Sequence, residues 1–390
     1  MDKRIYLSPP CMNGTEIEFI NEAFQTNWIS PFGPNLTGFE KEMCEYVGSK
    51  YSVALSSGTG AIHMGLKYLG VGPGDIVFCS DFTFSGSCNP VAYLGADLVF
   101  IDSDYESFNM DPNALKAAFE KYEALGRLPK AVIVVDLYGN SANYDKILPL
   151  CEKYNVPILE DAAEALGTTY KGKKCGTFGK VSALSFNGNK IVTTSGGGMA
   201  LSDDPEAIEK IHFWSNQSKE NVNYYLHNEI GYNYRMSNIC AGIGRGQLKN
   251  MDERIAARVR NYEFYKKAFA DLPVKMAPVL EGCQPNFWLS VITVNEESGV
   301  TPNDIIKALE DNNIESRRAW NPMHNQPIFS EKDFISCKEG ESVGNDIFRR
   351  GICMPSGTAM TEEDLGRVAS VFRSVFEKKK IITRTGYRFK

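Results

Sequence analysis

The sequence predicts an α/β protein with two domains. From residue 51 to residue 201, short apolar runs alternate with amphipathic segments, which is typical of a mostly parallel central sheet flanked by helices. A long helical region follows, and the rest of the chain mixes strand-like and helix-like runs. We therefore expect a large α/β domain over residues 13–250 and a smaller α+β domain over residues 251–390, with residues 1–12 associated with the smaller one.

After an extended start, the first helix is expected to begin at Asn13 or Thr15. Its apolar side chains recur at helical spacing on one face, namely Ile17, Ile20 and Phe24.

A loop rich in glycine and proline follows this helix, with the sequence NWISPFGPN. It carries Trp28 and Phe32, two large apolar side chains in an irregular segment. Such a loop either lines a binding pocket or is simply fixed in place by its packed aromatic rings.

The alternating region is expected to supply the central sheet. Strands are predicted at residues 51–55, 75–80, 98–102, 131–136, 156–161, 181–186 and 197–201, and helices at about 59–69, 88–94, 114–122 and 144–154. In sheets of this kind, ligands bind beyond the carboxyl ends of the strands. One rim should therefore gather the residues that follow the strands: 56–59, 80–84, Asp136, 160–161 and 187–190.

The second half of the chain starts with a helical region over about residues 237–269, which we expect to connect the domains. Its apolar positions recur every three or four residues, at Leu248, Met251, Ile255 and Val259. Beyond it, the smaller domain is expected to contain the strands FWLSVITV and ICMPSG, a helix over 303–309 and a last helix over about 362–376.

Composition narrows the classes of function. The chain has 390 residues, 43% of them hydrophobic, and a net charge of −6, which argues against a nucleic-acid or anionic membrane surface. No apolar run approaches the roughly 20 residues needed to cross a bilayer. The ten cysteines form no CxxC pair and the four histidines are scattered, so we expect reduced thiols, no metal site and a cytoplasmic protein.

The stretch SALSFNGNKIVTTSGGGM, residues 182–199, carries the central functional hypothesis. Lys190 follows an apolar strand and precedes three glycines, which permit close backbone approaches. A partly desolvated lysine at such a rim loses its proton more easily and can form a Schiff base with a carbonyl group. This is the chemistry of pyridoxal phosphate enzymes. Taken alone, a lysine in such a loop is more often a solvated surface residue, so the hypothesis depends on the residues that accompany it.

The other needs of pyridoxal phosphate also have candidates on the rim. Its phosphate needs amide and hydroxyl donors, which Gly58, Thr59 and Ser185 can supply, and its pyridine nitrogen needs a carboxylate, for which Asp161 is placed. Phe84 or Phe82 can cover the ring. SGTGAIH could also be a dinucleotide-binding loop, but His63 stands in place of the third glycine and disfavours this. For Asp161 alone, the alternative role is a helix cap.

The ordered motifs resemble the DegT/DnrJ family of sugar-nucleotide aminotransferases, which have the type I aspartate-aminotransferase fold. The resemblance spans essentially the whole chain and rests on SSGTGA, DFTF, LYGN, EDAAEALG, SFNGNK, TTSGGGM and GYNYRMS. It implies a pyridoxal 5′-phosphate enzyme in which Lys190 is the Schiff-base lysine and Asp161 pairs with the pyridine nitrogen. Phe84 would stack on the ring, and Gly58, Thr59 and Ser185 would hold the phosphate.

The resemblance also implies a homodimer with shared active sites. Asn233 would reach the phosphate of the neighbouring subunit. Glu164 stands where the family commonly has glutamine or histidine, beside the phenolic oxygen of the cofactor. Its carboxylate would either raise the local proton affinity or be a neutral choice of this subgroup.

Within the family, the likeness is to enzymes that aminate C4 of UDP-4-keto-6-deoxy-N-acetylhexosamines, with L-glutamate as the amino donor. Candidate substrate contacts are Trp28, Arg235, Trp320 and His324, together with Arg317 and Arg318, because a guanidinium binds carboxylates and phosphates bidentately. Each of these arginines has surface solvation as its alternative.

Three alternatives to this function remain at this point. They are a pyridoxal phosphate enzyme that acts on a 3-keto sugar, one that acts on an amino acid, and a non-catalytic regulator of the same fold. The regulator is disfavoured because it would not need Lys190, Asp161 and Phe84 together.

Overall fold

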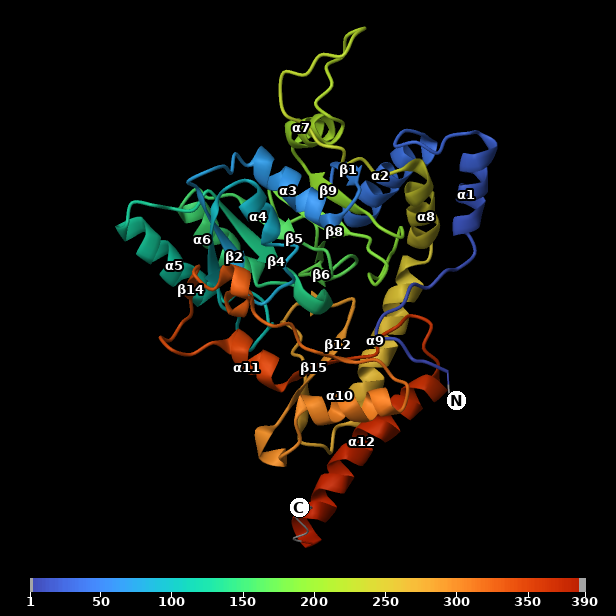
Figure 1. Cartoon of the computed structure of the whole chain (residues 1–390), viewed down its shortest axis with the longest axis vertical. Coiled ribbons are helices and arrows are strands. Elements are labelled where there is room, and N and C mark those ends of the chain that lie inside the picture. The colour runs from blue at the N-terminus through green and yellow to red at the C-terminus, as the bar shows by residue number, and fades with distance from the viewer. Residues whose placement is uncertain (1–2, 386–390) are drawn as a thin grey trace.

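The computed structural model describes residues 3–385, so the first two residues of the expected N-terminal segment lie outside the described part. It contains a large domain around an eight-stranded sheet and a smaller domain around a four-stranded sheet (Figure 1). The predicted α/β class is confirmed. The described helices include none that is long and apolar enough to span a bilayer.

The large sheet has the strand order β1-β9-β8-β5-β4-β2-β3-β14. Its strands are β1 (Tyr51–Leu55), β2 (Ile76–Ser80), β3 (Asp97–Ile101), β4 (Ala131–Val135), β5 (Ile158–Asp161), β8 (Val181–Ser185), β9 (Gly198–Ser202) and β14 (Asp333–Ile335). All neighbours pair in parallel except β9, which is antiparallel to both β1 and β8. Since β1 and β8 then run the same way, the carboxyl ends of β1, β2, β4, β5 and β8 share one edge.

One strand of this sheet was not expected from the sequence. β14 comes from the second half of the chain and pairs in parallel with β3, with Asp333 opposite Val99 and Ile335 opposite Ile101. It is only three residues long, which is too short for a periodic apolar pattern to be recognised. Through β14, the C-terminal half of the chain is joined directly to the large sheet.

Helices cover both faces of the large sheet, because alternate strand residues point to opposite sides. Phe78 of β2 packs in the core beneath α5 (Pro112–Ala124) and α6 (Tyr144–Lys153), whereas Cys79 packs in the core with α3 (Gly58–Tyr68), α4 (Asn89–Tyr93) and α7 (Pro205–Ser215). Two further helices, α1 (Glu16–Gln25) and α2 (Pro34–Val47), pack against α8 (Asn238–Leu248).

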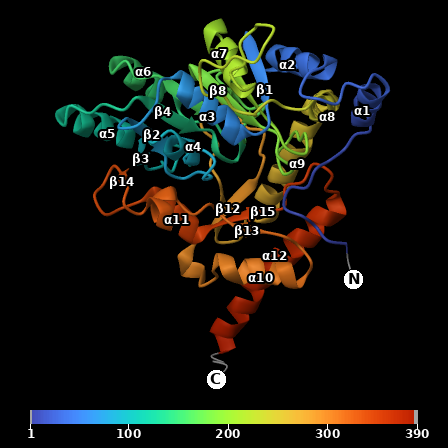
Figure 2. The same cartoon turned by 45° about the horizontal axis from the view of Figure 1, so that its top comes forward.

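The expected long helical region is two helices, α8 and α9 (Met251–Ala268), which are separated at Lys249 and Asn250. α9 carries Met251 into the core of the large domain and Tyr265 into a third core in the smaller domain. Figure 2 shows α9 running from the large domain to the smaller one. This helix therefore belongs to both hydrophobic cores.

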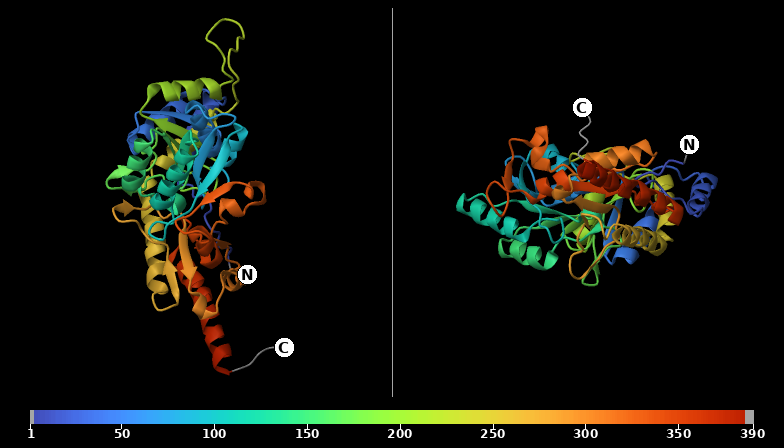
Figure 3. Two further views of the ribbon diagram at one scale, coloured as in Figure 1. Left: turned by 90° about the vertical axis from the view of Figure 1, so that its left-hand side faces the viewer. Right: turned by 90° about the horizontal axis from the view of Figure 1, so that it is seen from below.

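The smaller domain is built on a sheet of order β10-β12-β15-β13, with α10 (Pro302–Asp311) and α12 (Glu362–Thr385) packed on it. The strands are β10 (Val274–Met276), β12 (Ser290–Val294), β13 (Arg317–Arg318) and β15 (Gly351–Met354). α12 continues beyond residue 376, where it was expected to end, and extends away from the domain (Figure 3). α11 (Val343–Arg350) precedes β15, and Ile5 pairs with Ile314 and joins this core.

Short elements complete the described chain. They are the three-stranded sheet of β6 (Thr169–Tyr170), β7 (Lys173–Lys174) and β11 (Cys283–Gln284), and the 3₁₀ turns η1 (Leu137–Gly139), η2 (Glu296–Ser298), η3 (Met323–Asn325) and η4 (Pro327–Phe329).

Two apolar surfaces of the large domain face solvent. Ile17 and Phe24 of α1 are 54% and 62% exposed, so these two side chains of the expected apolar face are largely uncovered by the described residues, whereas Ile20 is partly buried. The loop between α7 and α8 projects beyond the molecule (Figures 1 and 3) and carries Tyr225 and Ile230, which are 82% and 79% exposed. Contiguous exposed apolar patches are typical of surfaces that bind other molecules.

Candidate active site

A cavity of about 950 Å³ opens at the carboxyl edge of the large sheet. Seven of the residues predicted for the cofactor line it: Gly58, Thr59, Phe84, Asp161, Glu164, Ser185 and Lys190. They follow or end β1, β2, β5 and β8, as expected from the parallel arrangement of these strands. The opposite wall comes from the smaller domain and from the N-terminal segment.

Lys190 lies in the loop after β8, and its side chain is only 12% exposed. Its Nζ donates a hydrogen bond to Glu164 Oε1 at 3.4 Å and lies 4.1 Å from the centre of the Trp288 ring. The indole Nε1 of Trp288 donates to the carbonyl of Asn189 at 2.7 Å and so fixes the lysine loop. Sequence reasoning missed Trp288, because one tryptophan at the start of an apolar strand reads as core.

Asp161 ends β5 with its carboxylate buried beneath the cavity floor. Oδ2 accepts from the hydroxyl of Ser87 at 2.6 Å, and Oδ1 accepts from the amide of Ala163 at 3.1 Å. Burial raises the pKa of Asp161, while the Ser87 and Ala163 hydrogen bonds oppose that shift. In residues 3–385 no cation forms an ion pair with Asp161, so its charge fits a ligand that brings a buried cation, such as a pyridinium.

The start of α3 forms a cradle with the end of β8. Ser57 caps the helix by accepting from the amide of Gly60, and the first amides of any helix lack carbonyl partners within it. A Cβ on Gly58 would lie 2.9 Å from Cβ of Ser185, and one on Gly198 would lie 2.3 Å from the carbonyl carbon of Ser57. Only glycine fits at these close approaches, and the resulting cradle of amides and hydroxyls suits a phosphate.

Phe84 and Phe82, the two candidates to cover the cofactor ring, lie in different environments. Phe84 lines the cavity and is 64% exposed, whereas Phe82 is buried against Tyr138. An exposed aromatic ring above a cavity can stack on a planar ligand, so Phe84 fits this position. Together, Phe84, Asp161, Lys190 and the cradle of α3 fit pyridoxal phosphate.

Glu164 is held rigidly beside Lys190. Its Oε2 accepts from the amide of Tyr138 at 2.7 Å, and its main-chain carbonyl accepts from Asn286 Nδ2 at 2.9 Å. Tyr138 adopts a left-handed backbone conformation, with φ of +56°. Non-glycine residues rarely adopt this conformation, which recurs at functional sites. The hydroxyl oxygen of Tyr138 also accepts from the amide of Trp320 at 2.8 Å.

Two substrate candidates lie on the cavity. Trp320 lines it, and its buried indole Nε1 has no hydrogen-bond partner among the described residues. Arg317 also lines the cavity, with a side chain that is 64% exposed and an ion pair to Glu315. Its neighbour Arg318 turns away, since its guanidinium donates to the carbonyl of Phe348 at 2.7 Å.

The other predicted site residues are not on the cavity lining of this chain. Arg235 is buried, with Nη1 at 2.8 Å from Glu40 Oε1 and 3.0 Å from the carbonyl of Ala54. His324 is bound to Asp81, with Nδ1 and Oδ2 2.6 Å apart. Trp28 is half exposed on its loop, and Asn233 is exposed at the base of the projecting loop.

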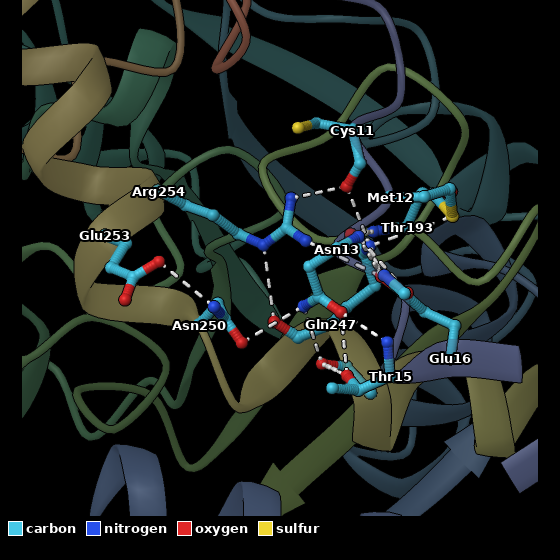
Figure 4. A network of polar contacts seen from close by, with 12 residues as sticks. Cys11, Met12, Asn13, Thr15, Glu16, Thr193, Gln247, Asn250, Glu253 and Arg254 are labelled. Atoms are coloured by element: carbon cyan, nitrogen blue, oxygen red, sulfur yellow. Dashed lines mark hydrogen bonds and ion pairs between the residues drawn. The ribbon is translucent and has the colours of Figure 1, made fainter. Parts of the chain in front are cut away.

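Sequence reasoning also missed the wall that the N-terminal segment forms. Residues 6–10 line the cavity, and Ser8 Oγ donates to the carbonyl of Asn189, next to the lysine. Figure 4 shows how the segment continues into a buried network, in which Gln247 and Arg254 both donate to the carbonyl of Cys11. Nothing in the local pattern of LSPPCMN indicates these contacts, because the partners lie between 181 and 243 residues away.

Comparison with known proteins gives a consistent result. Residues 10–373 match the DegT/DnrJ/EryC1/StrS aminotransferase family. EpsN of Bacillus subtilis, a candidate pyridoxal phosphate-dependent aminotransferase, is 49% identical over 377 residues, which cover 96% of this chain and 97% of EpsN. A GDP-perosamine synthase of Caulobacter vibrioides is 36% identical over 375 residues, which cover 95% and 98% of the two chains.

The fold agrees with these matches. A solved DegT DnrJ EryC1 StrS aminotransferase from Brucella abortus superposes with a TM-score of 0.85 at 29% identity, over 92% of this chain and 95% of that one.

Proposed function

Since this chain belongs to the DegT/DnrJ/EryC1/StrS aminotransferase family, we propose that it moves the amino group of glutamate to C4 of a UDP-linked 4-keto-6-deoxy-N-acetylhexosamine. The family, the fold and pyridoxal phosphate as cofactor are confirmed, as is the activity of a sugar aminotransferase. The nucleotide, the sugar and the roles of single residues are the proposal.

The observation that carries this proposal is the meeting of Lys190, Asp161 and Phe84 on one cavity beside the cradle of α3. When bound, pyridoxal phosphate supplies an aldehyde for Schiff-base formation and a pyridinium ring that withdraws electrons. Asp161 would keep the pyridine nitrogen protonated, and Phe84 would cover the ring. The amides of Gly58 and Thr59, with the hydroxyl of Ser185, would bind the phosphate.

Lys190 would have two duties in this site. Its Nζ supplies the amine that holds the cofactor, and the same nitrogen, once released, can hold a proton beside the substrate carbon that gains or loses one. The low exposure of the side chain, 12%, restricts access of water to that proton.

The substrates would enter between Arg317 and Trp320. The guanidinium of Arg317 can bind a carboxylate of glutamate or the diphosphate of the sugar nucleotide, and both are anionic. The Nε1 of Trp320, which finds no hydrogen-bond partner in the described part of the chain, can donate to a sugar hydroxyl or a phosphate oxygen. A GDP-linked sugar is the second candidate acceptor, favoured by the likeness to a GDP-perosamine synthase.

A homodimer with shared active sites is part of the proposal. The uncovered apolar side chains of α1 and of the projecting loop support it, because isolated protomers would expose them to water. Asn233, exposed at the base of that loop, would reach the phosphate bound by the partner subunit. The free cysteines favour a reducing compartment such as the cytoplasm.

The test starts with the absorption spectrum of the purified protein with pyridoxal phosphate. We expect a visible band that glutamate removes, and no such band in Lys190→Ala. Synthetic UDP- and GDP-linked 4-keto sugars are then offered with glutamate, and the products are identified by mass spectrometry. Amination of the GDP-linked sugar alone would overturn the nucleotide assignment, and a visible band that is indifferent to Lys190→Ala would refute the role of the lysine.

A further inference from the structure

Lys190 and Glu164 form a buried ion pair inside the cavity. Nζ donates to Oε1 at 3.4 Å, and the two side chains are 12% and 6% exposed. The Trp288 ring, 4.1 Å from Nζ, is a second stabilising neighbour of the ammonium. An ammonium has no lone pair and cannot attack a carbonyl carbon. A proton must therefore leave Nζ before the lysine reacts.

Glu164 is oriented so that one oxygen is directed at that proton. The amide of Tyr138 donates to Oε2 at 2.7 Å, and the left-handed conformation of Tyr138 accompanies this contact. Asn286 holds the main-chain carbonyl of Glu164. Oε1 is left to accept from Lys190, and both oxygens thus act as acceptors, which is the pattern of an ionised carboxylate.

The other titratable groups around the pair are less suited to take the proton. Asp161 already accepts from Ser87 and Ala163. Burial raises the pKa of Tyr138 well above its usual value and that of Cys353 to about 12, so both remain protonated at neutral pH. Arg317, at the cavity mouth, is a cation with no acceptor atom.

We propose that Glu164 is the catalytic base that deprotonates Lys190 when the lysine captures the aldehyde of pyridoxal phosphate. This inference rests on the proposed function. One ammonium proton passes to Oε1, and the lone pair left on Nζ forms a bond to the aldehyde carbon. The two remaining protons leave with the carbonyl oxygen as water, so that a C=N double bond replaces the C=O bond. The proton on Glu164 then lies beside the nitrogen and can return to it.

The electrostatics of the pocket agree with this role. Burial raises the pKa of Glu164, while the charge of Lys190 and the Tyr138 hydrogen bond oppose the rise. A carboxylate whose proton affinity is raised is a better base near neutral pH than one in water. Once the lysine charge has been consumed, the proton stays on Glu164 more readily, because the buried carboxylate has lost its counter-ion.

The inference is tested by the rate at which the protein without cofactor captures pyridoxal phosphate, followed as growth of the visible band across the neutral pH range. Glu164→Gln keeps the size of the side chain and an oxygen for the Tyr138 amide, but removes the base. We expect capture to slow at least about 100-fold at neutral pH, to recover as pH rises and to reach the wild-type band in the end. Glu164→Asp should give an intermediate rate.

Glu42→Gln is the matched control, since Glu42 pairs with Arg245 outside the cavity and its loss should leave capture unchanged. Wild-type rates and an unchanged pH profile in Glu164→Gln would overturn the inference. If that variant does not fold by circular dichroism, a wild-type rate in Glu164→Asp would overturn it instead. Failure of the proposed function is distinct, because the wild-type protein would then show no band or Lys190→Ala would retain one.

Discussion

Gly198→Ala is predicted to break the cradle at the start of α3. Gly198 begins β9, between β1 and β8, and its Cα faces the turn that leads into α3. A Cβ at this position would lie 2.3 Å from the carbonyl carbon of Ser57 and 2.4 Å from the amide nitrogen of Gly58. Ordinary contact begins at 3.4 Å, so the sheet and the helix start would have to separate by about 1 Å.

The magnitude follows from the rigidity of both partners. The clash is with backbone atoms, and no side chain can rotate away to relieve it. Overpacking in a well-packed core typically costs about 1–3 kcal/mol, and we expect a loss of about 3 kcal/mol in the free energy of unfolding, at the upper end of that range. The amides of Gly58 and Thr59 would move with the helix start, so the affinity for pyridoxal phosphate should fall at least about tenfold.

Urea unfolding of the cofactor-free protein, at one fixed protein concentration, measures the first effect, and titration with pyridoxal phosphate measures the second. Gly366→Ala is the matched control. It lies within α12 with open space around the added methyl group, and should be stabilising by about 0.5–1 kcal/mol without altering cofactor affinity. A Gly198→Ala protein with wild-type stability and affinity would refute the assignment of this close approach as the phosphate cradle.

Three further outcomes follow from the site. Asp161→Asn keeps the side-chain shape but loses the charge, so the half-reaction with glutamate should slow at least about 100-fold. Stopped-flow absorbance measures this rate. An unchanged rate would contradict the contact between Asp161 and the pyridinium. Phe84→Ala should weaken cofactor binding. Because Phe84 is 64% exposed, the same change should shift the free energy of unfolding by less than about 0.5 kcal/mol. Titration with pyridoxal phosphate measures the first effect, and urea unfolding measures the second. Burial lowers the pKa of His63 from 6.5 to about 4, so the unfolded chain binds the extra proton first as pH falls. His63 therefore contributes stability that is present above pH 6.5 and is lost as pH falls toward about 4. His63→Phe should reduce the pH dependence of the free energy of unfolding, measured in urea, within that window. An unaltered pH dependence would contradict this role of His63.

The sequence was sufficient to predict most of the large sheet, because its strands are short apolar runs separated by amphipathic helices. The position of Lys190 and Asp161 on one rim follows from the same rule, since carboxyl ends of parallel strands share an edge. The orientation of β9 was not predictable from its apolar pattern, which is the same for either direction. β14 was missed because a strand of three residues is too short to show an alternating apolar pattern.

Side-chain partners that come from distant parts of the chain were harder to predict. Nothing in the sequence around Arg235 indicates that its side chain is buried. Its charge is balanced in the interior by Glu40, which lies 195 residues earlier. His324 likewise pairs with Asp81, which the sequence places 243 residues away. Trp288 and the segment over residues 6–10 reach the cavity only because the smaller domain packs against the lysine loop. These contacts depend on tertiary packing, and no local pattern encodes it.

The two hydrogen bonds of Tyr138 connect Glu164 with Trp320, one of the proposed substrate contacts. Its amide donates to Glu164 beside the lysine, and its hydroxyl oxygen accepts from the main-chain amide of Trp320, a proposed substrate contact. The rings of Tyr138 and Trp320 also pack, with centroids 5.3 Å apart, so a library that varies the Trp320 side chain to accept another sugar would remove a packing contact of the residue that orients Glu164. Changes in sugar specificity and in cofactor chemistry are therefore coupled through Tyr138. Variants at Trp320 and Tyr138 should be selected together rather than one position at a time.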